Sequence, residues 1–317
     1  MKFSVGYQLF ENDKFTSSII DFKEYVSEVY FSWGDFPNGR NNQIKHMGLL
    51  PWVAQNKQME DLKRLSDSGI KLNLLFNANC YGSNSQSREF FSKIGDTIDY
   101  IKENYGLSSI TTTSPLIAKF VKNNFVNLHI RASVNMEIGS IEGMKYIAEY
   151  FDGYYMKREF NRDFDKIKEL HSWCEDNGKE LYLLANSGCL NNCSVHNFHD
   201  NLVAHESEIA KIDNAYNFQG ICREYLKKEE NYEALILNTN FVRPEDVYRY
   251  EPYFKAAKLA TRVNPNPIRI LESYIRGTYS GNILELLEPA HNIYPYILEN
   301  GNPLKLRKLD TDIAFLE

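Results

Sequence analysis

Short apolar runs rich in β-branched and aromatic residues alternate along the chain with stretches of helical periodicity. In one such stretch Met59, Leu62 and Leu65 recur at helical spacing, and Gly69 follows where a helix C-cap would lie. Apolar runs separated in this way are typical of the strands of an α/β protein. The predicted strands are Ser4–Leu9, Glu28–Ser32, Lys71–Asn77, Ser109–Thr112, Asn127–Ala132, Gly153–Lys157, Glu180–Leu184 and Ala234–Asn238.

Strands that are separated by helices pair in parallel through right-handed crossovers, and eight such units close naturally into a barrel. The pattern therefore predicts a single (β/α)8 TIM-like barrel domain over residues 1–317, with its site at the carboxyl ends of the strands. From about residue 252 to 317 we expect a C-terminal extension of helices and loops packed on the barrel. The alternative is an open doubly wound sheet, but neither glycine-rich nucleotide-binding fingerprint follows a predicted strand.

Composition and charge narrow the classes of function. The net charge of −6 argues against a protein that mainly binds a phosphate backbone, so no extended nucleic-acid surface is expected. No window approaches the roughly 18 apolar residues of a membrane helix, and the first residues lack the apolar core of a signal peptide. We therefore expect a cytoplasmic protein without membrane contact, in which the five cysteines indicate metal binding or catalysis before disulfides.

Polar residues cluster at and beyond the ends of the predicted strands, where a barrel places its active site. Arg40, Asn77, Arg131 and Arg158 are the candidate substrate-binding residues among them. Guanidinium groups match carboxylates and phosphates, so the three arginines predict a substrate with an anionic group. Loops are polar in most proteins, and the repetition after successive strands is more informative than any one residue.

The densest polar segment follows the seventh predicted strand and carries Cys189 and Cys193, with Cys222 farther along. Two cysteines four apart on a loop can turn both sulfurs toward one soft metal centre, and thiolates favour zinc or an iron–sulfur cluster over magnesium or calcium. The alternative is buried free thiols, as expected for Cys174 on the apolar stripe of a helix. Cys80, at the end of the third predicted strand, is either a fourth metal ligand, which we favour, or a free thiol in the pocket.

The run Cys189-x3-Cys193-x2-His196 is similar to the radical S-adenosylmethionine motif with its last cysteine replaced. That motif supplies three thiolates and normally follows the first strand of a barrel, whereas this run follows the seventh predicted strand. We therefore expect His196 to be a pocket residue rather than a metal ligand.

Several passages together carry a family resemblance. They are Arg131-Ala-Ser-Val-Asn135, residues 151–170 with the pair Arg158-Glu159, the cysteine loop, and Lys258-Leu-Ala-Thr-Arg262. In these passages the chain resembles the collagenase-like (PrtC-type) peptidases of family U32.

The resemblance implies a barrel-like α/β fold and a four-cysteine iron–sulfur cluster, of the four-iron, four-sulfur (4Fe–4S) type. It also implies an activity of the kind that supports oxygen-independent hydroxylation of RNA bases or quinone precursors. Cys189, Cys193 and Cys222 are carried over as ligands, together with the Arg158-Glu159 pair. The tight Cys-x3-Cys spacing departs from the wider spacing of the family and indicates a divergent member.

From this resemblance we expect an iron–sulfur enzyme of anaerobic metabolism that acts on a small molecule or a modified base. Glu159, His196 and His205 are the candidate groups for proton transfer. One alternative is a non-catalytic cluster-binding subunit that depends on a homologous partner subunit. Another is a metal-dependent peptidase or hydrolase, although His205-Glu206 lacks the second histidine of a His-Glu-x-x-His site.

Overall fold

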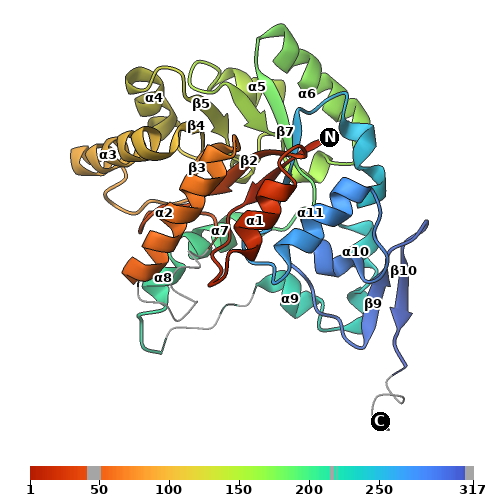
Figure 1. The fold of residues 1–317 in the computed structure, drawn as a ribbon. Coiled ribbons are helices and arrows are strands. Elements are labelled where there is room, and N and C mark those ends of the chain that lie inside the picture. The colour runs from red at the N-terminus through yellow and green to blue at the C-terminus, as the bar shows by residue number, and fades with distance from the viewer. Residues whose placement is uncertain (41–50, 215–217, 219, 311–317) are drawn as a thin grey trace.

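A computed structural model describes residues 1–40, 51–214, 218 and 220–310. Within these residues, eight parallel strands pair in chain order and close into a barrel with helices around it (Figure 1). The (β/α)8 barrel predicted from the alternating pattern is therefore confirmed. The strands are β1 (Lys2–Gly6), β2 (Val26–Phe31), β3 (Lys71–Phe76), β4 (Leu107–Thr112), β5 (His129–Ala132), β6 (Gly153–Tyr155), β7 (Glu180–Leu184) and β8 (Ala256–Leu259).

The helices between the strands form as their sequences predict. In α3, Ile94 and Ile98 lie on the buried face, the Ser87 side chain accepts the backbone N–H of Phe90, and Gly106 ends the helix at φ 70°. The helices of the outer layer are α1 (Lys14–Asp21), α2 (Pro51–Asp67), α3 (Arg88–Tyr105), α4 (Pro115–Asn124), α5 (Ile141–Lys145), α6 (Phe164–Asp176) and α11 (Pro267–Arg276). The short 3-10 helices are η2 (Val134–Met136), η3 (Arg158–Phe160), η4 (Glu229–Asn231), η5 (Pro244–Tyr250) and η6 (Ile283–Leu286).

The eighth strand lies elsewhere than the sequence pattern indicated. The prediction of a strand at Ala234–Asn238 is wrong, because Ala234–Leu237 forms the helix α10 and β8 is Ala256–Leu259. β8 pairs with both β1 and β7 and so closes the barrel. A short apolar run does not distinguish a strand from a helix by its periodicity, and Lys258 interrupts the apolar run of β8.

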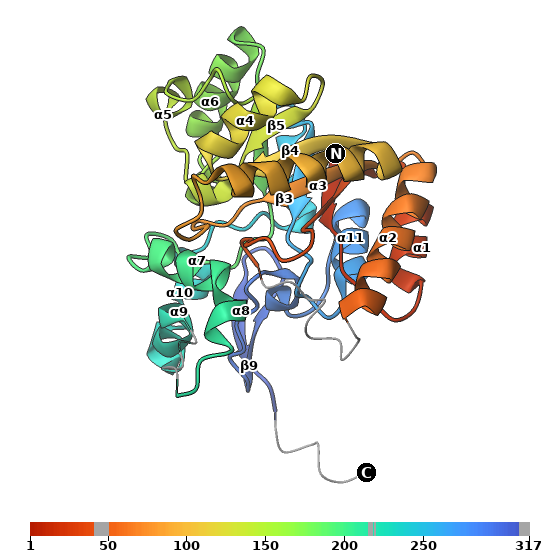
Figure 2. The ribbon, with the colours of Figure 1, turned by 90° about the vertical axis from the view of Figure 1, so that its left-hand side faces the viewer.

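The chain between β7 and β8 makes a separate group of short helices at the carboxyl ends of the strands. Figure 2 shows this group below the barrel, beside β9. Its described helices are α7 (His196–Ala204), α8 (Glu206–Ile209), α9 (Ile221–Tyr225) and α10 (Ala234–Leu237). The group supplies one wall of the site described below.

The C-terminal segment 252–317, expected as an extension, supplies both β8 and α11 of the barrel. Helix α11 packs beside α1, which completes the outer layer (Figure 1). After α11 the chain forms a two-stranded antiparallel sheet of β9 (Tyr296–Glu299) and β10 (Lys305–Lys308). That the whole chain is one domain stays a prediction.

Candidate functional site

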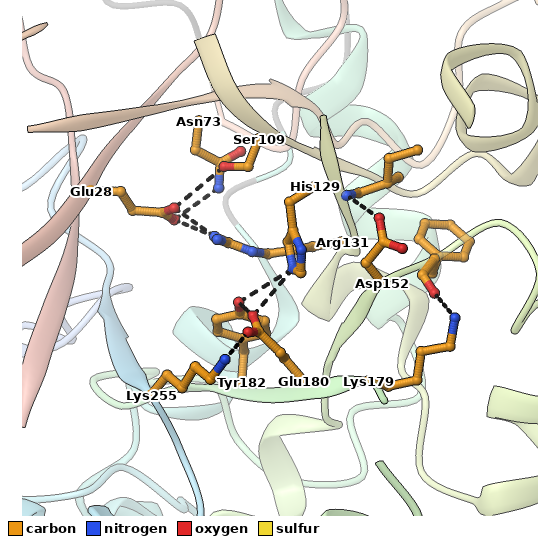
Figure 3. Close-up of polar contacts among 12 residues, drawn as sticks. Glu28, Asn73, Ser109, His129, Arg131, Asp152, Lys179, Glu180, Tyr182 and Lys255 are labelled. Carbon is orange, nitrogen blue, oxygen red and sulfur yellow. Dashed lines mark hydrogen bonds and ion pairs between the residues drawn. The ribbon is translucent and has the colours of Figure 1, made fainter. Parts of the chain in front are cut away.

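Polar side chains occupy the barrel interior, a position that branched apolar residues fill in most barrels of this type. The interior centres on Glu28 of β2, whose two carboxylate oxygens each lie 2.6 Å from Nη1 of Arg131 of β5 (Figure 3). Asn73 and Ser4 also donate to Glu28 Oε1, at 2.9 and 2.7 Å. Burial alone would raise the pKa of Glu28, but the charge and hydrogen bonds of Arg131 hold it below its ordinary value. The pair is a buried, well-satisfied link between β2 and β5.

The amino-terminal rim of the barrel is held by a second polar group around β7. His129 Nε2 lies 3.3 Å from Glu180 Oε2, and Lys255 and Tyr182 also bond to the Glu180 carboxylate (Figure 3). The Arg131 guanidinium stacks on the Tyr182 ring at 4.4 Å and joins this rim to the interior pair. In barrels of this type the amino-terminal end serves stability, and the active site lies at the carboxyl end. Arg131, predicted to bind substrate, therefore lies in the barrel interior with Glu28 as its partner.

Lys258 of β8 points into the same interior. Its ammonium lies 4.1 Å from the centre of the Tyr30 ring and 5.0 Å from that of Tyr155. Burial, with a further contribution from the charge of Arg262, lowers the pKa of Lys258 to about 7. The Lys258-to-Arg262 step that the sequence singled out therefore runs from the barrel interior to its carboxyl end.

A pocket of about 570 Å³ opens beyond the carboxyl ends of the strands, and Cys189, Cys193 and Cys222 all line it. We call it the cysteine pocket. The first two cysteines lie in the loop after β7, and the third lies on α9, far along the chain. The three thiols therefore lie around one pocket, although they come from two segments that are far apart in the chain.

The loop that carries Cys189 is fixed against residues 286–291. The Asn186 side chain donates to the carbonyl of Leu286 at 2.8 Å and bonds to the backbone of Ala260. Gly188 has no room for a side chain, because a Cβ there would lie 2.3 Å from the carbonyl oxygen of Pro289. These contacts set the position of the first thiol before any ligand binds.

Cys222 approaches the other two thiols from the α9 side. A Cβ at Gly220 would lie 3.8 Å from Cys222 Sγ and 3.7 Å from His199, so thiol and imidazole flank the same turn. Burial, and then the charges of Cys189 and Cys193, raise the pKa of the Cys222 thiol. The three sulfurs are therefore close enough to influence one another electrostatically.

Two guanidinium groups border the thiols. Arg158 Nη1 lies 3.5 Å from Cys189 Sγ, and its Nη2 lies 3.3 Å from Asn135 Oδ1. Arg40 Nε donates to Glu288 Oε1 at 2.6 Å. Both arginines line the cysteine pocket, and their role in substrate binding stays a prediction. Together they give it positive charge next to a thiol.

His196 at the start of α7 faces the cysteine pocket between two carboxylates. Its Nδ1 lies 2.5 Å from Glu137 Oε1, and its Nε2 lies 3.4 Å from Asp200 Oδ2. Glu137 and Asp200 come from different elements, so the imidazole is held from both sides. Of the three residues predicted to transfer protons, His196 alone is among those that line this pocket.

The other predicted residues lie outside the cysteine pocket. Glu159 accepts the backbone N–H of Asn192 at 2.8 Å and pairs with Lys157 at 2.6 Å, which braces the cysteine loop. Asn77 Oδ1 accepts the backbone N–H of Gly39 at 3.1 Å, which ties the end of β3 to the loop after β2. Both side chains support the pocket from behind.

Cys80 and His205 also lie outside the cysteine pocket, and they interact with each other. An interaction with His205 is the main cause that holds the pKa of the Cys80 thiol below its ordinary value, and His205 Nδ1 lies 3.1 Å from Glu208 Oε2. Cys80 is not among the residues that line the pocket, although the side chain of its neighbour Asn79 donates to Asp200 Oδ2 at 3.5 Å.

Sequence analysis did not identify several residues that line the cysteine pocket. They are Gln8, His199, Asp200, Arg223 and Glu288. His196 and Asp200 are four apart on α7 and so share a helix face, a signal that was present in the sequence. Burial lowers the pKa of His199, which leaves its imidazole neutral at neutral pH. Glu288 comes from a segment far along the chain, and no motif in the sequence around it indicates that it lines the pocket.

The three cysteines of the pocket are of the residue type by which proteins hold iron–sulfur clusters. Within residues 1–40, 51–214, 218 and 220–310, no three Cys, His, Asp or Glu side chains lie close enough together to hold one ion. A cluster takes its thiolates at separate irons, so its ligands stand farther apart than those of one zinc ion. Cys189, Cys193 and Cys222 line one pocket of about 570 Å³, and Cys80 is not among the residues that line it.

Comparison with known proteins bears on the family. No family model matches the chain. The "Uncharacterized protease MJ1657" of Methanocaldococcus jannaschii is 27% identical over 288 residues, covering 88% of this chain and 80% of that protein. The solved structure of the "U32 Peptidase Mk0906" has a TM-score of 0.58 at 12% identity, over 81% of this chain and 91% of that one.

The chain is thus similar in sequence to this archaeal protein, and it shares the barrel fold of the solved U32 structure. In the part of the chain that the structure describes, no helix is both long and apolar enough to cross a membrane.

Proposed function

We propose that this protein is an enzyme that holds an iron–sulfur cluster in the cysteine pocket through Cys189, Cys193 and Cys222. The observation that carries the proposal is the placement of three thiols, from two segments far apart in the chain, around one pocket beside Arg158 and Arg40. Thiolate ligation is the usual way in which proteins hold such clusters.

The arginines give the site its electrostatic character. A cluster with three thiolates carries negative charge, and the Arg158 guanidinium at 3.5 Å from Cys189 Sγ offsets part of it. Arg40 is fixed by Glu288, and its side chain remains partly exposed to the pocket. These guanidinium groups would also bind a carboxylate or phosphate of a substrate.

His196 is the residue best placed to hold or move a proton in the pocket. Glu137 accepts from Nδ1, which leaves Nε2 directed toward Asp200 and the pocket. An imidazole between two carboxylates can take up a proton and pass it on without a large change in position. The bound cluster would supply redox or Lewis-acid chemistry to the same pocket.

The reaction class that the family resemblance favours is oxygen-independent hydroxylation, or a related redox modification, of a small molecule or modified base. The size of the pocket suits a small molecule or a single flipped base, and the arginines suit an anionic group on it. The fold alone does not decide among substrates of this kind.

Anaerobic purification tests the proposal directly. Iron, acid-labile sulfide and visible absorbance are measured for the wild type and for Cys189→Ser, Cys193→Ser and Cys222→Ser. We expect a brown wild-type protein with iron and sulfide in equal amounts, and loss of most of both in each variant. Cys174→Ala is the matched control, because this thiol lies on the buried face of α6 and its removal should leave the iron content unchanged. A colourless, iron-free wild type would contradict the proposal.

A zinc-dependent hydrolase is the second candidate, since the archaeal relative is named a protease. Cys189, Cys193, Cys222 and the neutral His199 line the pocket, and they would have to move closer together on binding to hold one zinc ion. One zinc and no iron per chain, with peptide cleavage that a chelator abolishes, would favour this function over the cluster.

A further inference from the structure

A second pocket, of about 290 Å³, is lined by the three arginines Arg162, Arg243 and Arg249. Arg162 lies just before α6, and the other two lie at the start and near the end of η5. Residues 301–304, from the loop between β9 and β10, form another part of its lining. We call it the arginine pocket. None of the residues that line it lines the cysteine pocket, so the two are separate places on the protein.

Arg162 is fixed in this pocket by an uncharged partner. Its Nε and Nη2 both donate to the carbonyl oxygen of Phe241, at 3.1 and 2.8 Å, and its guanidinium lies 4.9 Å from the centre of the Phe241 ring. Within the described residues it forms no ion pair, and its Nη1 donates no hydrogen bond. A carbonyl carries no net charge, so these contacts orient the guanidinium without neutralising it.

Arg249 is held in a similar way, by an aromatic ring. Its guanidinium lies 4.8 Å from the centre of the Phe164 ring, and the residue is exposed. In the part of the chain that the structure describes, Arg249 has neither a hydrogen bond nor an ion pair. Stacking uses the face of a guanidinium and leaves the N–H groups at its edges open to a ligand.

Arg243 alone of the three is paired with a carboxylate. Its Nε donates to Asp246 Oδ2 at 2.7 Å, and its Nη1 donates to the carbonyl oxygen of Gly301. Asp246 is the one carboxylate among the lining residues, so three guanidinium groups and one carboxylate leave a net charge of +2. Asp163, next to Arg162 in the chain, is engaged as the N-cap of α6, where it accepts the backbone N–H of Lys166.

The positive charges of the arginine pocket are close enough to repel one another. Partial burial lowers the pKa of Arg162, and the charge of Arg243 lowers it further. An anion bound between these groups would remove the repulsion. A phosphate group carries about two negative charges at neutral pH and offers three acceptor oxygens, which match the net charge of the lining and the open guanidinium edges.

We propose that the arginine pocket is a binding site for a phosphate group, held by Arg162, Arg243 and Arg249. The volume of about 290 Å³ lies at the lower end of the range for small-molecule sites, so it suits free phosphate or the phosphate of a small metabolite. In the second case the apolar lining residues Val242 and Leu304 would contact the organic part. The site does not depend on the cluster proposed for the cysteine pocket.

Isothermal titration calorimetry of the full-length protein at constant ionic strength tests the ligand class. The probes are inorganic phosphate, ribose 5-phosphate and acetate. We expect both phosphates to bind at least tenfold more tightly than acetate. Tighter binding of ribose 5-phosphate would identify a phosphorylated metabolite as the ligand, and equal binding of the two would identify free phosphate. Acetate binding as tightly as either phosphate would overturn the proposal, because the pocket would then attract any anion.

Variants of the arginines test the assignment to this pocket. Arg249→Gln should weaken phosphate binding roughly tenfold, the usual effect of losing one charge-assisted hydrogen bond, and should leave the Tm unchanged because Arg249 bonds to no other described residue. Arg162→Gln should weaken binding at least as much, with its Tm measured because the bonds to Phe241 are also lost. Arg276→Gln is the matched control, since this arginine of α11 is 70% exposed and lines neither pocket. Unchanged affinity in Arg249→Gln would overturn the proposal.

A protection experiment separates this pocket from the arginines of the cysteine pocket. The protein is treated with phenylglyoxal, which modifies arginine, with and without phosphate, and modified peptides are quantified by mass spectrometry. Phosphate should slow the modification of Arg162 and Arg249. Protection confined to Arg40 and Arg158 would place the phosphate in the cysteine pocket and overturn the proposal. A wild type without iron contradicts the proposed function only, and the titrations and the protection pattern still decide this one.

Discussion

The barrel interior and the cysteine pocket contain similar polar side chains but differ in how those side chains are hydrogen-bonded. In the interior, the Glu28 carboxylate accepts hydrogen bonds from Arg131, Asn73 and Ser4, and Arg131 Nε is left without a partner. In the described part of the pocket, buried polar atoms without a hydrogen-bond partner gather: Gln8 Oε1, Arg158 Nε, His196 Nε2 and Glu288 Oε2. Native proteins rarely leave such atoms unpaired, so these four atoms mark the pocket as a place where a ligand could be bound, whereas the Glu28 network links strands of the barrel.

The largest expected loss of stability comes from removing a charged side chain from the barrel interior. Arg131→Met leaves the Glu28 carboxylate buried without its cation, since the two side chains are only 3% and 11% exposed. Removing one partner of a buried pair costs about 3–5 kcal/mol of the free energy of unfolding. Chemical denaturation at neutral pH measures the loss, and the double variant with Glu28→Gln should regain part of it. A loss below about 1 kcal/mol would show that the interior pair is not structural.

Arg40→Met makes the corresponding change in the cysteine pocket. The Arg40 side chain is 25% exposed, so water can replace part of its bond to Glu288. We expect a smaller loss of unfolding free energy, about 1–2 kcal/mol, measured by the same denaturation. A loss equal to that of Arg131→Met would remove the distinction between the two regions.

The pH dependence of the free energy of unfolding tests how deeply Lys258 is buried in the barrel interior. Its pKa is about 7 in the folded protein, whereas an unfolded lysine titrates near 10.4, so the unfolded chain binds more protons between these values. The Lys258 contribution to the free energy of unfolding therefore rises with pH, by at most about 1.4 kcal/mol per pH unit. Denaturation between about pH 7 and 9 should give a shallower rise for Lys258→Met than for the wild type. Equal slopes would contradict the lowered pKa.

The pocket cysteines should contribute least to the stability of the metal-free chain. Cys189→Ser is expected to change the free energy of unfolding of the apo protein by no more than about 0.5 kcal/mol, because the thiol lines a pocket. Cys174→Ala, at a core position that is 1% exposed, should cost about 1 kcal/mol or more. Thermal or chemical unfolding of both apo variants makes the comparison, and the reverse order would place Cys189 in the core.

The sequence could predict most of the fold because each strand is a local apolar run between helical patterns. Seven of the predicted strands overlap observed ones within the described residues. The eighth could not be predicted because β8 carries Lys258, whose charge is accommodated only by rings from β2 and β6 that the chain brings together on folding. The apolar Ala234–Leu237 run had the stronger local signal and became a short helix.

The sequence by itself determined the barrel and indicated Cys189, Cys193, Arg40, Arg158 and His196 as residues of one functional end, since all follow strands whose carboxyl ends meet. Only the tertiary structure decided the partners. In the structure Arg131 pairs with Glu28, Cys80 interacts with His205, and Arg40 pairs with Glu288. The members of these pairs are separated by 103, 125 and 248 positions along the chain. Contacts of that range depend on how far-apart segments pack, and no local pattern of side chains records that packing.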